Sequence, residues 1–582
     1  MMKLQKVWNK KLFAAMLGAG LLFSPCVGRA ISVADVTGRS AGVNVGSLAN
    51  GVDITSTAQN NVVNWSSYNV GRDQTVQYDA HNYLNLIGGN GPSQIDGTLI
   101  GDGNIYLINP NGVLFGDGCT VNVGNLYVSS NTLTAKAISD FEDNGTNPLA
   151  GSVANGGDIV NLGKIYANSV YFEGNNVTLT TESVKDVEAA VVRAQGEINV
   201  CFADGEDAVK VNNDQFKNEP DIKNITNVEW QDLAGYERND VTSYWQIRNV
   251  YELQNMKNNL SANYALVTDI DAITTERWND GAGFQPVGTT TAFEEYNSAY
   301  TGKFDGLNHK INGLSINRPT KDYVGLFGFT HNAEVKNLSI SGQIIGNLYV
   351  GSIAGYNDAG TIKNVTNEGN VKGMYVGGLA GLNSNGTVIG VNKGNVMGEA
   401  LLWEYVRDEF GHVILDDYGT AMYFEKVSRA DYVGGLVGYS GRRSSEMGPE
   451  LGVVTGTNFG KVAGNNFVGG LVGSNEAKVT GQNMGTVKGY GAFSGDLVGE
   501  NFGTVNGTDA NFKNIFEDID IILNGVEAIG LNRVLKVFSV AEDYQRLNLD
   551  TILLQPGLNI NLAGQVIAGN TLPLVQFEKD EE

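Results

Sequence analysis

The sequence predicts an all-β fold, a right-handed parallel β-helix or solenoid, from three observations. Between Asn61 and Gly118, short alternating apolar runs are broken every few residues by Gly, Asn or Asp, which is strand-and-turn patterning. From Val324 onward, a glycine-rich hexapeptide recurs six times, first from Val324 to Val350 to Val376, as expected of a solenoid. Glycine supplies 76 of 582 residues, about 13% and roughly twice ordinary usage. Such a composition suits many short strands joined by tight corners.

The charge of the chain excludes some classes of partner. Its formal net charge is −24 and its pI is near 4.6. Nucleic acid is disfavoured as a partner because phosphate binding needs a basic surface, and anionic membranes are disfavoured for the same reason. The acidity is interpreted as a source of solubility, since no acidic loop or nonapeptide array typical of Ca²⁺ binding occurs.

Candidate catalytic and metal-binding residues are sparse. The three cysteines are Cys26, Cys119 and Cys201, and no Cys-x-x-Cys or Cys/His cluster exists, so neither a disulfide framework nor a zinc site is expected. The histidines are isolated in sequence, and no GxSxG or HExxH motif occurs. We therefore predict no enzyme activity, cofactor or metal, although carboxylates on the flank of a β-helix could still form a carbohydrate-active site.

Residues 1–30 have the pattern of a cleaved secretory signal. Four lysines precede an apolar run from Leu12 to Phe23, and small residues follow, with possible cleavage after Ala30 or Ala34. The run is too short to span a bilayer comfortably. No later stretch approaches 18 apolar residues, so no transmembrane segment is predicted in the mature chain.

Residues 31–200 form the first predicted block, and its sharpest element is the corner Asn109-Pro110-Asn111-Gly112. The segment IYLI precedes this corner and VLFG follows it. Proline presets φ for a tight turn, and Asn or Gly tolerates positive φ beside it. Two buried strands joined by a stiff polar corner are predicted here. The polar stretch Ile138–Asn155 is expected to be a surface loop.

The first block resembles the amino-terminal secretion domain of filamentous-haemagglutinin-like exoproteins, the exported partners of two-partner secretion systems in Gram-negative bacteria. The resemblance rests on motifs in the family's order: WSSYNVG from Trp65, SQIDG from Ser93, the Ile105–Gly116 segment with its NPNG corner, and VNVGNL from Val121. It implies a β-helix, Sec-dependent export, and recognition of this block by an outer-membrane transporter. As a hypothesis, Asn109, Pro110, Asn111 and Gly112 shape the block for export.

Two segments connect this block to the repeats. Residues 201–245 are charged and are interpreted as a junction. Residues 246–320 form a lead-in with one helix, because Leu253, Met256 and Leu260 fall at helical spacing; a strand, Tyr264–Ile270, is expected next. This order of elements resembles the lead-in found before GLUG-repeat regions of bacterial surface proteins.

Residues 321–510 contain the six copies, which resemble GLUG motifs. They begin at Val324, Val350, Val376, Val433, Val468 and Ser494, and the two longer spacings contain insertions near 399–430 and 442–450. Their glycines are interpreted as sites of sharp corners and close backbone approach, because no copy has a phosphate-binding loop followed by a helix. The Val and Leu of each copy are expected to stack into inner ladders.

The insertion 399–430 is a candidate partner-contact loop. It is rich in aromatic and charged residues, unlike its surroundings, and its proposed contact residues are Trp403, Tyr405, Arg407 and Phe410. Such residues are typical of binding hot spots, although the loop could equally be a lid packed on the coils. Residues 511–582 are expected to be a C-terminal β segment.

These observations predict a secreted surface exoprotein that reaches the cell surface through Sec and the outer membrane. Its expected role is adhesion to a host-cell surface, a glycan, a matrix ligand or a biofilm. Two alternatives remain open: a carbohydrate-active enzyme on the same scaffold, and a structural matrix or surface-layer protein. The sequence names no ligand.

Overall fold

The computed structural model describes residues 30–150, 156–289, 298–398, 400–405, 423–428, 432–441, 452–489 and 493–509, with the short pair 522–523 and 558–559. The predicted signal, up to residue 29, lies outside these ranges. The chain divides into two compact units. Unit 1 comprises Met1–Asp207, Gln215–Arg248 and Asn263–Thr268, and unit 2 comprises Ala208–Asp214, Asn249–Ala262 and Asp269–Glu582.

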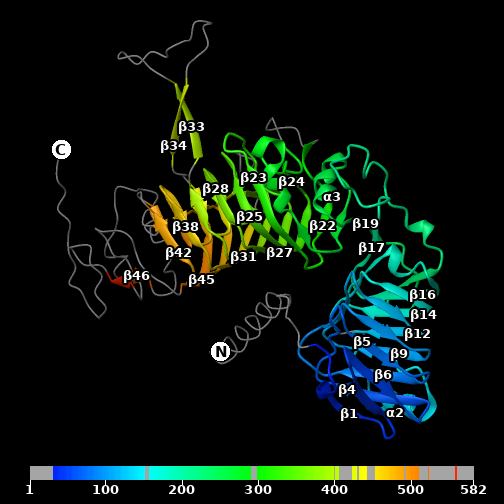
Figure 1. Ribbon diagram of the computed structural model, residues 1–582. Helices are drawn as coiled ribbons and strands as arrows, with labels where there is room; N and C mark the ends of the chain where they lie inside the picture. Colours follow the sequence, from blue (N-terminus) through cyan, green and yellow to red (C-terminus); the bar gives the residue numbers. More distant parts are fainter. Residues whose placement is uncertain are drawn as a thin grey trace, which may run out of the picture. The chain divides into compact units, whose positions relative to one another are not determined.

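Unit 1 is a parallel β-helix in which successive coils contribute strands to three sheets (Figure 1). The first sheet contains β1 (Val36–Arg39), β4 (Asn60–Trp65), β6 (Asn82–Ile87), β9 (Asn104–Ile108), β12 (Asn125–Ser129), β14 (Lys164–Gly174), β16 (Val187–Ala194) and β18 (Val228–Gln231). The second contains β2 (Asn44–Leu48), β3 (Gly51–Thr55), β5 (Thr75–Tyr78), β8 (Thr98–Ile100), β11 (Thr120–Asn122) and the start of β14. The third contains β7 (Ser93–Ile95), β10 (Val113–Phe115), β13 (Ile159–Asn161), β15 (Val177–Thr180), β17 (Ile198–Phe202), β19 (Thr242–Ile247) and β20 (Tyr264–Leu266).

The coils of unit 1 are held together by aliphatic side chains that stack in register. In the second sheet the stacked residues, each 1% exposed or less, are Val52, Val76, Leu99, Val121 and Ile165. At the amino-terminal end, β1 pairs with β4 and β2 pairs with β3 in antiparallel fashion. These reversed strands cover sheet edges that would otherwise be open to further pairing.

One helix in unit 1 corrects the sequence-based expectation. The sequence predicts a surface loop over Ile138–Asn155, but α2 spans Ala135–Asn144. Thr134 caps its first turn, and Gly145 ends it with φ +69°. Phe141 is buried and packs edge-on against Tyr106 at 5.2 Å. The helix therefore covers part of the outer face of the first sheet with only a few apolar residues. Because the rest of the segment is polar, little helical periodicity is visible in its sequence.

The predicted junction, residues 201–245, contains regular structure. Strand β18 lies within this segment and β19 begins at its end. In parallel fashion, β18 pairs with β16 and β19 pairs with β17. The predicted helix is confirmed in its first part as α3 (Val250–Asn255), which is followed by a 3₁₀ turn at Met256–Asn258, with Leu253 and Met256 fully buried. Leu260, the third residue of the predicted helical spacing, lies beyond both. The single strand expected at Tyr264–Ile270 is instead two short strands, β20 and β21 (Ile270–Asp271).

Unit 2 is also built from parallel coils (Figure 1). Its largest sheet contains β21, β22 (Lys303–Asp305), β23 (Lys310–Asn317), β25 (Glu334–Ile345), β27 (Thr361–Asn367), β28 (Asn370–Gly373), β31 (Thr387–Asn392), β32 (Val396–Gly398), β37 (Val453–Asn458), β38 (Lys461–Gly464), β41 (Lys478–Asn483), β42 (Thr486–Gly489) and β45 (Thr504–Asp509). A second contains β24 (Phe327–His331), β26 (Ala354–Asp358), β30 (Ala380–Ser384), β36 (Val437–Ser440), β40 (Val472–Asn475) and β44 (Val498–Asn501). A third contains β29 (Tyr375–Gly377), β35 (Tyr432–Gly434), β39 (Phe467–Gly469) and β43 (Phe493–Gly495).

The predicted ladders of the six repeat copies are confirmed. The first residues of the copies pair directly, in the order Val324, Val350, Val376, Val433, Val468 and Ser494. The Leu or Ile of each copy is 2% exposed or less, namely Leu326, Ile353, Leu379, Leu436, Leu471 and Leu497. The glycines allow close approach, since a Cβ at Gly434 would lie 1.9 Å from a backbone oxygen of Val437. Each copy is therefore one corner of one coil.

The insertion and the C-terminal segment are described only in part. Within 399–430, β33 (Ala400–Tyr405) and β34 (Tyr423–Ser428) form an antiparallel hairpin in a sheet of their own. Within 511–582, β46 (Ile522–Leu523) and β47 (Leu558–Asn559) pair antiparallel. The smaller insertion, 442–450, lies outside the described residues.

Candidate functional site

The NPNG corner lies between β9 and β10 in unit 1. Asn109 is fully buried, and its backbone oxygen accepts a 2.9 Å hydrogen bond from the Gly112 amide, which closes the turn. Its Oδ1 accepts from the Asn111 amide at 2.9 Å, while its Nδ2 donates to the Gly91 oxygen at 3.1 Å and to Ser93 Oγ at 3.0 Å. One side chain therefore fixes both the turn and its attachment to the preceding coil.

The corner is also bonded to the coils that follow. The Asn109 amide donates to the Ser129 oxygen at 3.0 Å, and the Gly157 amide donates to the Pro110 oxygen at 2.8 Å. Gly112 has φ +105°, and a Cβ there would lie 2.5 Å from the Asp158 oxygen. Because only glycine fits this conformation and this spacing, the motif requires Gly112 on steric grounds.

Only part of this motif can be contacted in the folded coil. Asn111 is exposed and Pro110 is half-buried, whereas Asn109 and Gly112 are buried. Any effect of Asn109 on export must therefore act through folding or on the chain before it folds. The four residues are brought together as the sequence predicts, and their role in export stays a prediction.

The predicted contact residues of the insertion are placed only in part. Trp403 and Tyr405 lie on β33, opposite Glu425 and Tyr423 of β34. Arg407 and Phe410 lie outside the described residues. The hairpin leaves the coils between β32 and β35, which is the corner immediately before a repeat copy.

A row of aromatic residues occupies that same corner in successive coils, and sequence reasoning missed it. It consists of Tyr323, Tyr349, Tyr375, Tyr432 and Phe467, which we call the aromatic strip. Ring centroids along the strip are 5.2, 5.2, 4.8 and 5.0 Å apart. The signal was present in the sequence, because an aromatic residue immediately precedes all six repeat copies.

The described histidines are not isolated in the fold, although they are isolated in sequence. The Nδ1 atoms of His81, His309 and His331 lie 2.7, 3.1 and 2.8 Å from carboxylate oxygens of Asp79, Asp269 and Asp358, respectively. No sequence motif could reveal the last two pairs, because 40 and 27 residues separate their members. His412 lies outside the described residues.

Hydrogen bonding perturbs two of these carboxylates. Burial raises the pKa of Asp79, but hydrogen bonds from the Ser56 amide, Tyr83 and His81 outweigh it and hold that pKa below its usual range. The pKa of Asp269 is lowered mainly by the hydrogen bond from His309, with a further contribution from the Lys310 amide. These contacts stabilise ionised carboxylates, as in structural ion pairs.

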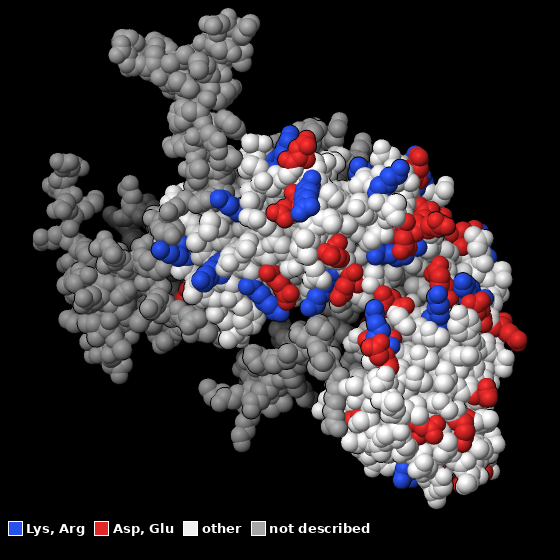
Figure 2. Space-filling view, viewed as in Figure 1, with Lys and Arg blue, Asp and Glu red and all other residues white. Residues whose placement is uncertain are grey.

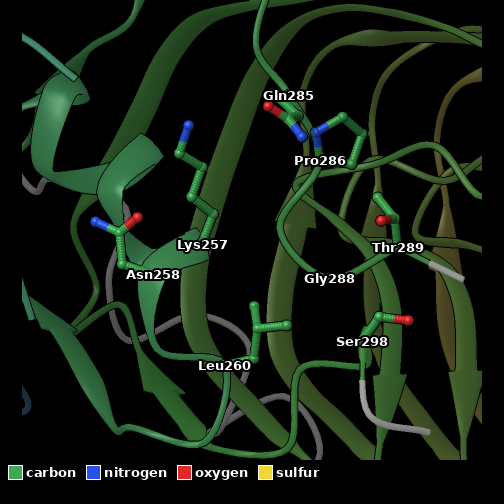
Figure 3. Close-up of a pocket in the computed structure, with 8 residues that line it drawn as sticks. All are labelled: Lys257, Asn258, Leu260, Gln285, Pro286, Gly288, Thr289 and Ser298. Atoms are coloured by element: carbon green, nitrogen blue, oxygen red, sulfur yellow. The ribbon is translucent and has the colours of Figure 1, made fainter. Parts of the chain in front are cut away.

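A cavity of about 250 Å³ lies in unit 2 beside the 3₁₀ turn after α3 (Figure 3). It is lined by Lys257, Asn258, Leu260, Gln285, Pro286, Gly288, Thr289 and Ser298. Asn258 directs its Nδ2 away from the cavity, where it donates to the Asn212 oxygen at 2.7 Å. The cavity is polar, with one cation and no carboxylate in its lining.

Charges of both signs are interspersed on the described surface in the view of Figure 2. Some are paired between neighbouring coils, such as Lys363 with Glu334 at 2.6 Å and Lys393 with Glu368 at 3.0 Å. Within the described ranges, no three His, Cys, Asp or Glu side chains are grouped as metal ligands. None of the helices that the structure describes has the length and hydropathy needed to cross a bilayer.

Comparison with known families assigns the first block. The model of the TPS secretion domain matches residues 33–258, which contain the coils around the NPNG corner. The chain carries a TPS secretion domain. The model of the GLUG motif matches residues 346–372, which include the copy that begins at Val350. A TPS domain implies export across the outer membrane with a partner transporter.

The chain also matches segments of larger proteins. It is 40% identical over 138 residues to halomucin of Haloquadratum walsbyi, covering 22% of this chain and 2% of that protein. It is 32% identical over 145 residues to a heme/hemopexin-binding protein of Haemophilus influenzae, covering 23% of this chain and 16% of that protein. The chain thus spans only a small part of the curated relatives that it matches.

Among solved structures, the chain matches the crystal structure of the HMW1 secretion domain from Haemophilus influenzae. Sequence identity is 13%, and the match covers 78% of this chain and 99% of that one. The TM-score is 0.23, which is too low for the likeness to carry an argument. The β-helix assignment rests on the parallel pairing described above.

Proposed function

We propose that this protein is a two-partner exoprotein that acts outside the cell as an adhesin. In this proposal, unit 1 directs the chain to an outer-membrane transporter. The repeat coils of unit 2 then present the surface that binds a host cell, a glycan or a matrix. The observation that carries the export step is the secretion-domain match over residues 33–258. Support for adhesion is the stack of repeat coils, in which a hairpin and a row of aromatic residues occupy one corner.

The export step is tested by producing the full chain in a Gram-negative host with and without a two-partner transporter. We expect the protein in the medium only when the transporter is present. Substituting both Asn109 and Asn111 should reduce the secreted amount several-fold, because the corner of the first block would be lost. Unchanged secretion of that double variant would refute the role of the motif.

The adhesion step is tested with purified protein on epithelial cells and on biofilm-forming bacteria. We expect saturable binding to at least one of these surfaces. Glycans incubated with the protein should stay uncleaved, whereas cleavage would favour the alternative of a carbohydrate-active enzyme. Binding of the protein only to itself would favour a matrix or surface-layer role. The name of one relative makes haem a useful comparison ligand in the same assay.

A further inference from the structure

The aromatic strip of unit 2 is wider than a single row. Further aromatic residues lie beside it on the sheet of β24, β26, β30 and β36, where Phe329 stacks on Tyr356 at 4.8 Å. Leu382 occupies the matching position in the next coil and Tyr439 in the coil after it. These residues meet the strip twice, at 6.2 Å between Tyr323 and Tyr356 and at 5.6 Å between Tyr432 and Tyr439. Aromatic rings thus follow the coil axis without interruption from Tyr323 to Phe467.

Five of these rings are partly accessible, since Tyr349, Tyr375, Tyr432, Phe467 and Tyr439 are half-buried. Tyr323, Phe329 and Tyr356 are buried in an apolar cluster with Leu382. The rings do not form one closed stack, since the planes of Tyr349 and Tyr375 are inclined by 67° and those of Tyr375 and Tyr432 by 55°. Cohesion between coils is already supplied by the fully buried Val and Leu ladders. The partly accessible aromatic rings are therefore not needed to hold the coils together.

Two of these tyrosines occupy a costly backbone conformation. Tyr323 has φ +57° and Tyr349 has φ +56°. A bulky residue in this left-handed region is an energetically costly outlier, and Asn or Gly would avoid most of that cost. Residues held in such conformations cluster at ligand-binding and active sites. The placement of tyrosine at these corners therefore points to a role for the side chain.

The shape and charge of the strip restrict its ligand. It is one to two rings wide and follows five coils, about 20 Å at the usual spacing between neighbouring strands, which suits a linear polymer lying along the axis. Its rings are uncharged, the Glu476 carboxylate accepts a 2.8 Å hydrogen bond from the adjoining Tyr439, and the chain carries a net charge of −24, so polyanions would be repelled. An added peptide strand is disfavoured because β29, β35 and β39 already have neighbours in their sheet.

We propose that the aromatic strip binds an extended, uncharged glycan. The accessible parts of the rings would contact the C–H groups of successive sugar units, as aromatic rings contact other apolar surfaces. Tyrosine hydroxyl groups would exchange hydrogen bonds with sugar hydroxyls, because each can donate and accept. The repeat of one ring per coil would meet one sugar unit per coil. This inference deepens the proposed adhesive function and rests on it.

The test is calorimetric titration of the full-length purified protein with neutral hexasaccharides, cellohexaose and mannohexaose, and with a sulfated heparin hexasaccharide. We expect at least one neutral hexasaccharide to bind, its disaccharide to bind at least ten-fold more weakly, and heparin not to bind. The double variant Tyr375→Ala/Tyr432→Ala should lose at least ten-fold in affinity. Tyr432→Phe should lose less, because it keeps the ring.

The matched control is Tyr127→Ala in unit 1. Tyr127 is also half-buried and stacks on Tyr106 at 4.2 Å, but it lies outside the strip, so glycan affinity should be unchanged. Thermal unfolding of each variant reports whether its coils remain folded. The proposal is overturned if no neutral hexasaccharide binds, if heparin binds more tightly, or if the folded double variant keeps full affinity.

A failure of this inference can be distinguished from a failure of the proposed function. If the protein adheres to cells but neutral hexasaccharides neither bind nor compete, adhesion stands and the strip is not the glycan site. If hexasaccharides bind at the strip but no cell or biofilm is bound, the glycan site stands and the adhesive function is wrong.

Discussion

The side-chain Nδ2 of Asn392 donates a 2.7 Å hydrogen bond to Oδ1 of Asn458, although 66 residues separate them in sequence. The same bond joins Asn367 to Asn392 at 2.7 Å and Asn458 to Asn483 at 2.8 Å, each across 25 residues. The two insertions, between β32 and β35 and between β36 and β37, therefore leave the buried asparagine ladder in register. The ladder marks one corner of each coil and satisfies polar groups inside the stack.

Removing one member of this ladder should destabilise unit 2. In Asn392→Ala, the buried Nδ2 of Asn367 and Oδ1 of Asn458 each lose a partner, and so does the Gly394 oxygen. Asn367 Nδ2 keeps the Gly369 oxygen and Asn458 Oδ1 keeps the Gly460 amide as partners. Because each lost buried hydrogen bond costs about 0.5–1.5 kcal/mol, we expect a loss of about 2 kcal/mol in urea unfolding. The control is Asn395→Ala, because Asn395 makes the same amide contact, with Asn370 at 2.8 Å, on an exposed ladder. Equal losses in both variants would contradict the role assigned to burial.

Deleting residues 399–430 should leave the coils folded. The deletion joins Gly398 to Tyr432 through one residue, which matches the intact corner from Gly373 to Tyr375. Because the hairpin has a sheet of its own, we expect the thermal unfolding midpoint to change little. If the hairpin is a partner-contact element, binding to cells should fall at least several-fold. Intact cell binding by this deletion variant would end the contact proposal for 399–430.

The structure predicts different losses of stability for substitutions at the two asparagines of the NPNG corner. Asn109→Ala removes two side-chain donor bonds and two acceptor bonds from a buried site, so we expect unit 1 to lose about 2–3 kcal/mol by the same reasoning. Asn111→Ala removes an exposed bond to the Gly89 oxygen and a 3.3 Å bond to Asn109 Oδ1, which keeps the backbone amide as a donor, and it should cost well under 1 kcal/mol. Denaturant unfolding of the purified variants measures both. A larger loss in Asn111→Ala would refute the structural ranking.

Secretion of the same two variants separates two roles of the motif. If export depends on folding of the first coil, secretion should follow stability and fall mainly in Asn109→Ala. If the transporter recognises the motif in the unfolded chain, both variants should be secreted poorly despite their different stabilities. Gly112→Ala is the steric control, since its Cβ would meet the Asp158 oxygen without removing any polar group.

The parts of the fold that sequence could predict are those with a repeated local signal. The repeat copies were predictable because glycine spacing and alternating Val and Leu report the corner and the inner face of every coil. Helix α2 was not, because Phe141 and few other apolar residues hold it on the sheet. The aromatic strip was visible in sequence, but a repeat defined by its glycines hides the Tyr or Phe before each copy. The two distant His–Asp pairs were beyond sequence reasoning, because their contact depends on the register between coils.

The pair of Asp269 and His309 predicts how the stability of unit 2 depends on pH. The hydrogen bond from His309 and that from the Lys310 amide lower the pKa of Asp269 in the folded protein. A carboxyl whose folded pKa is depressed contributes stability above its ordinary pKa of about 4 and loses that contribution as pH falls through the lower folded value. Asp269→Asn should therefore be less stable than the native chain at neutral pH.

The difference between Asp269→Asn and the native chain should shrink as pH falls below about 4, the ordinary pKa of the carboxyl. Urea unfolding midpoints of both proteins, measured from neutral pH into this acid range, provide the test. His309→Gln removes the largest cause of the pKa shift, so it should flatten the same pH dependence without removing the carboxylate. A constant difference between Asp269→Asn and the native chain at every pH would show that the ionised pair does not stabilise unit 2, and that the substitution acts only through lost packing.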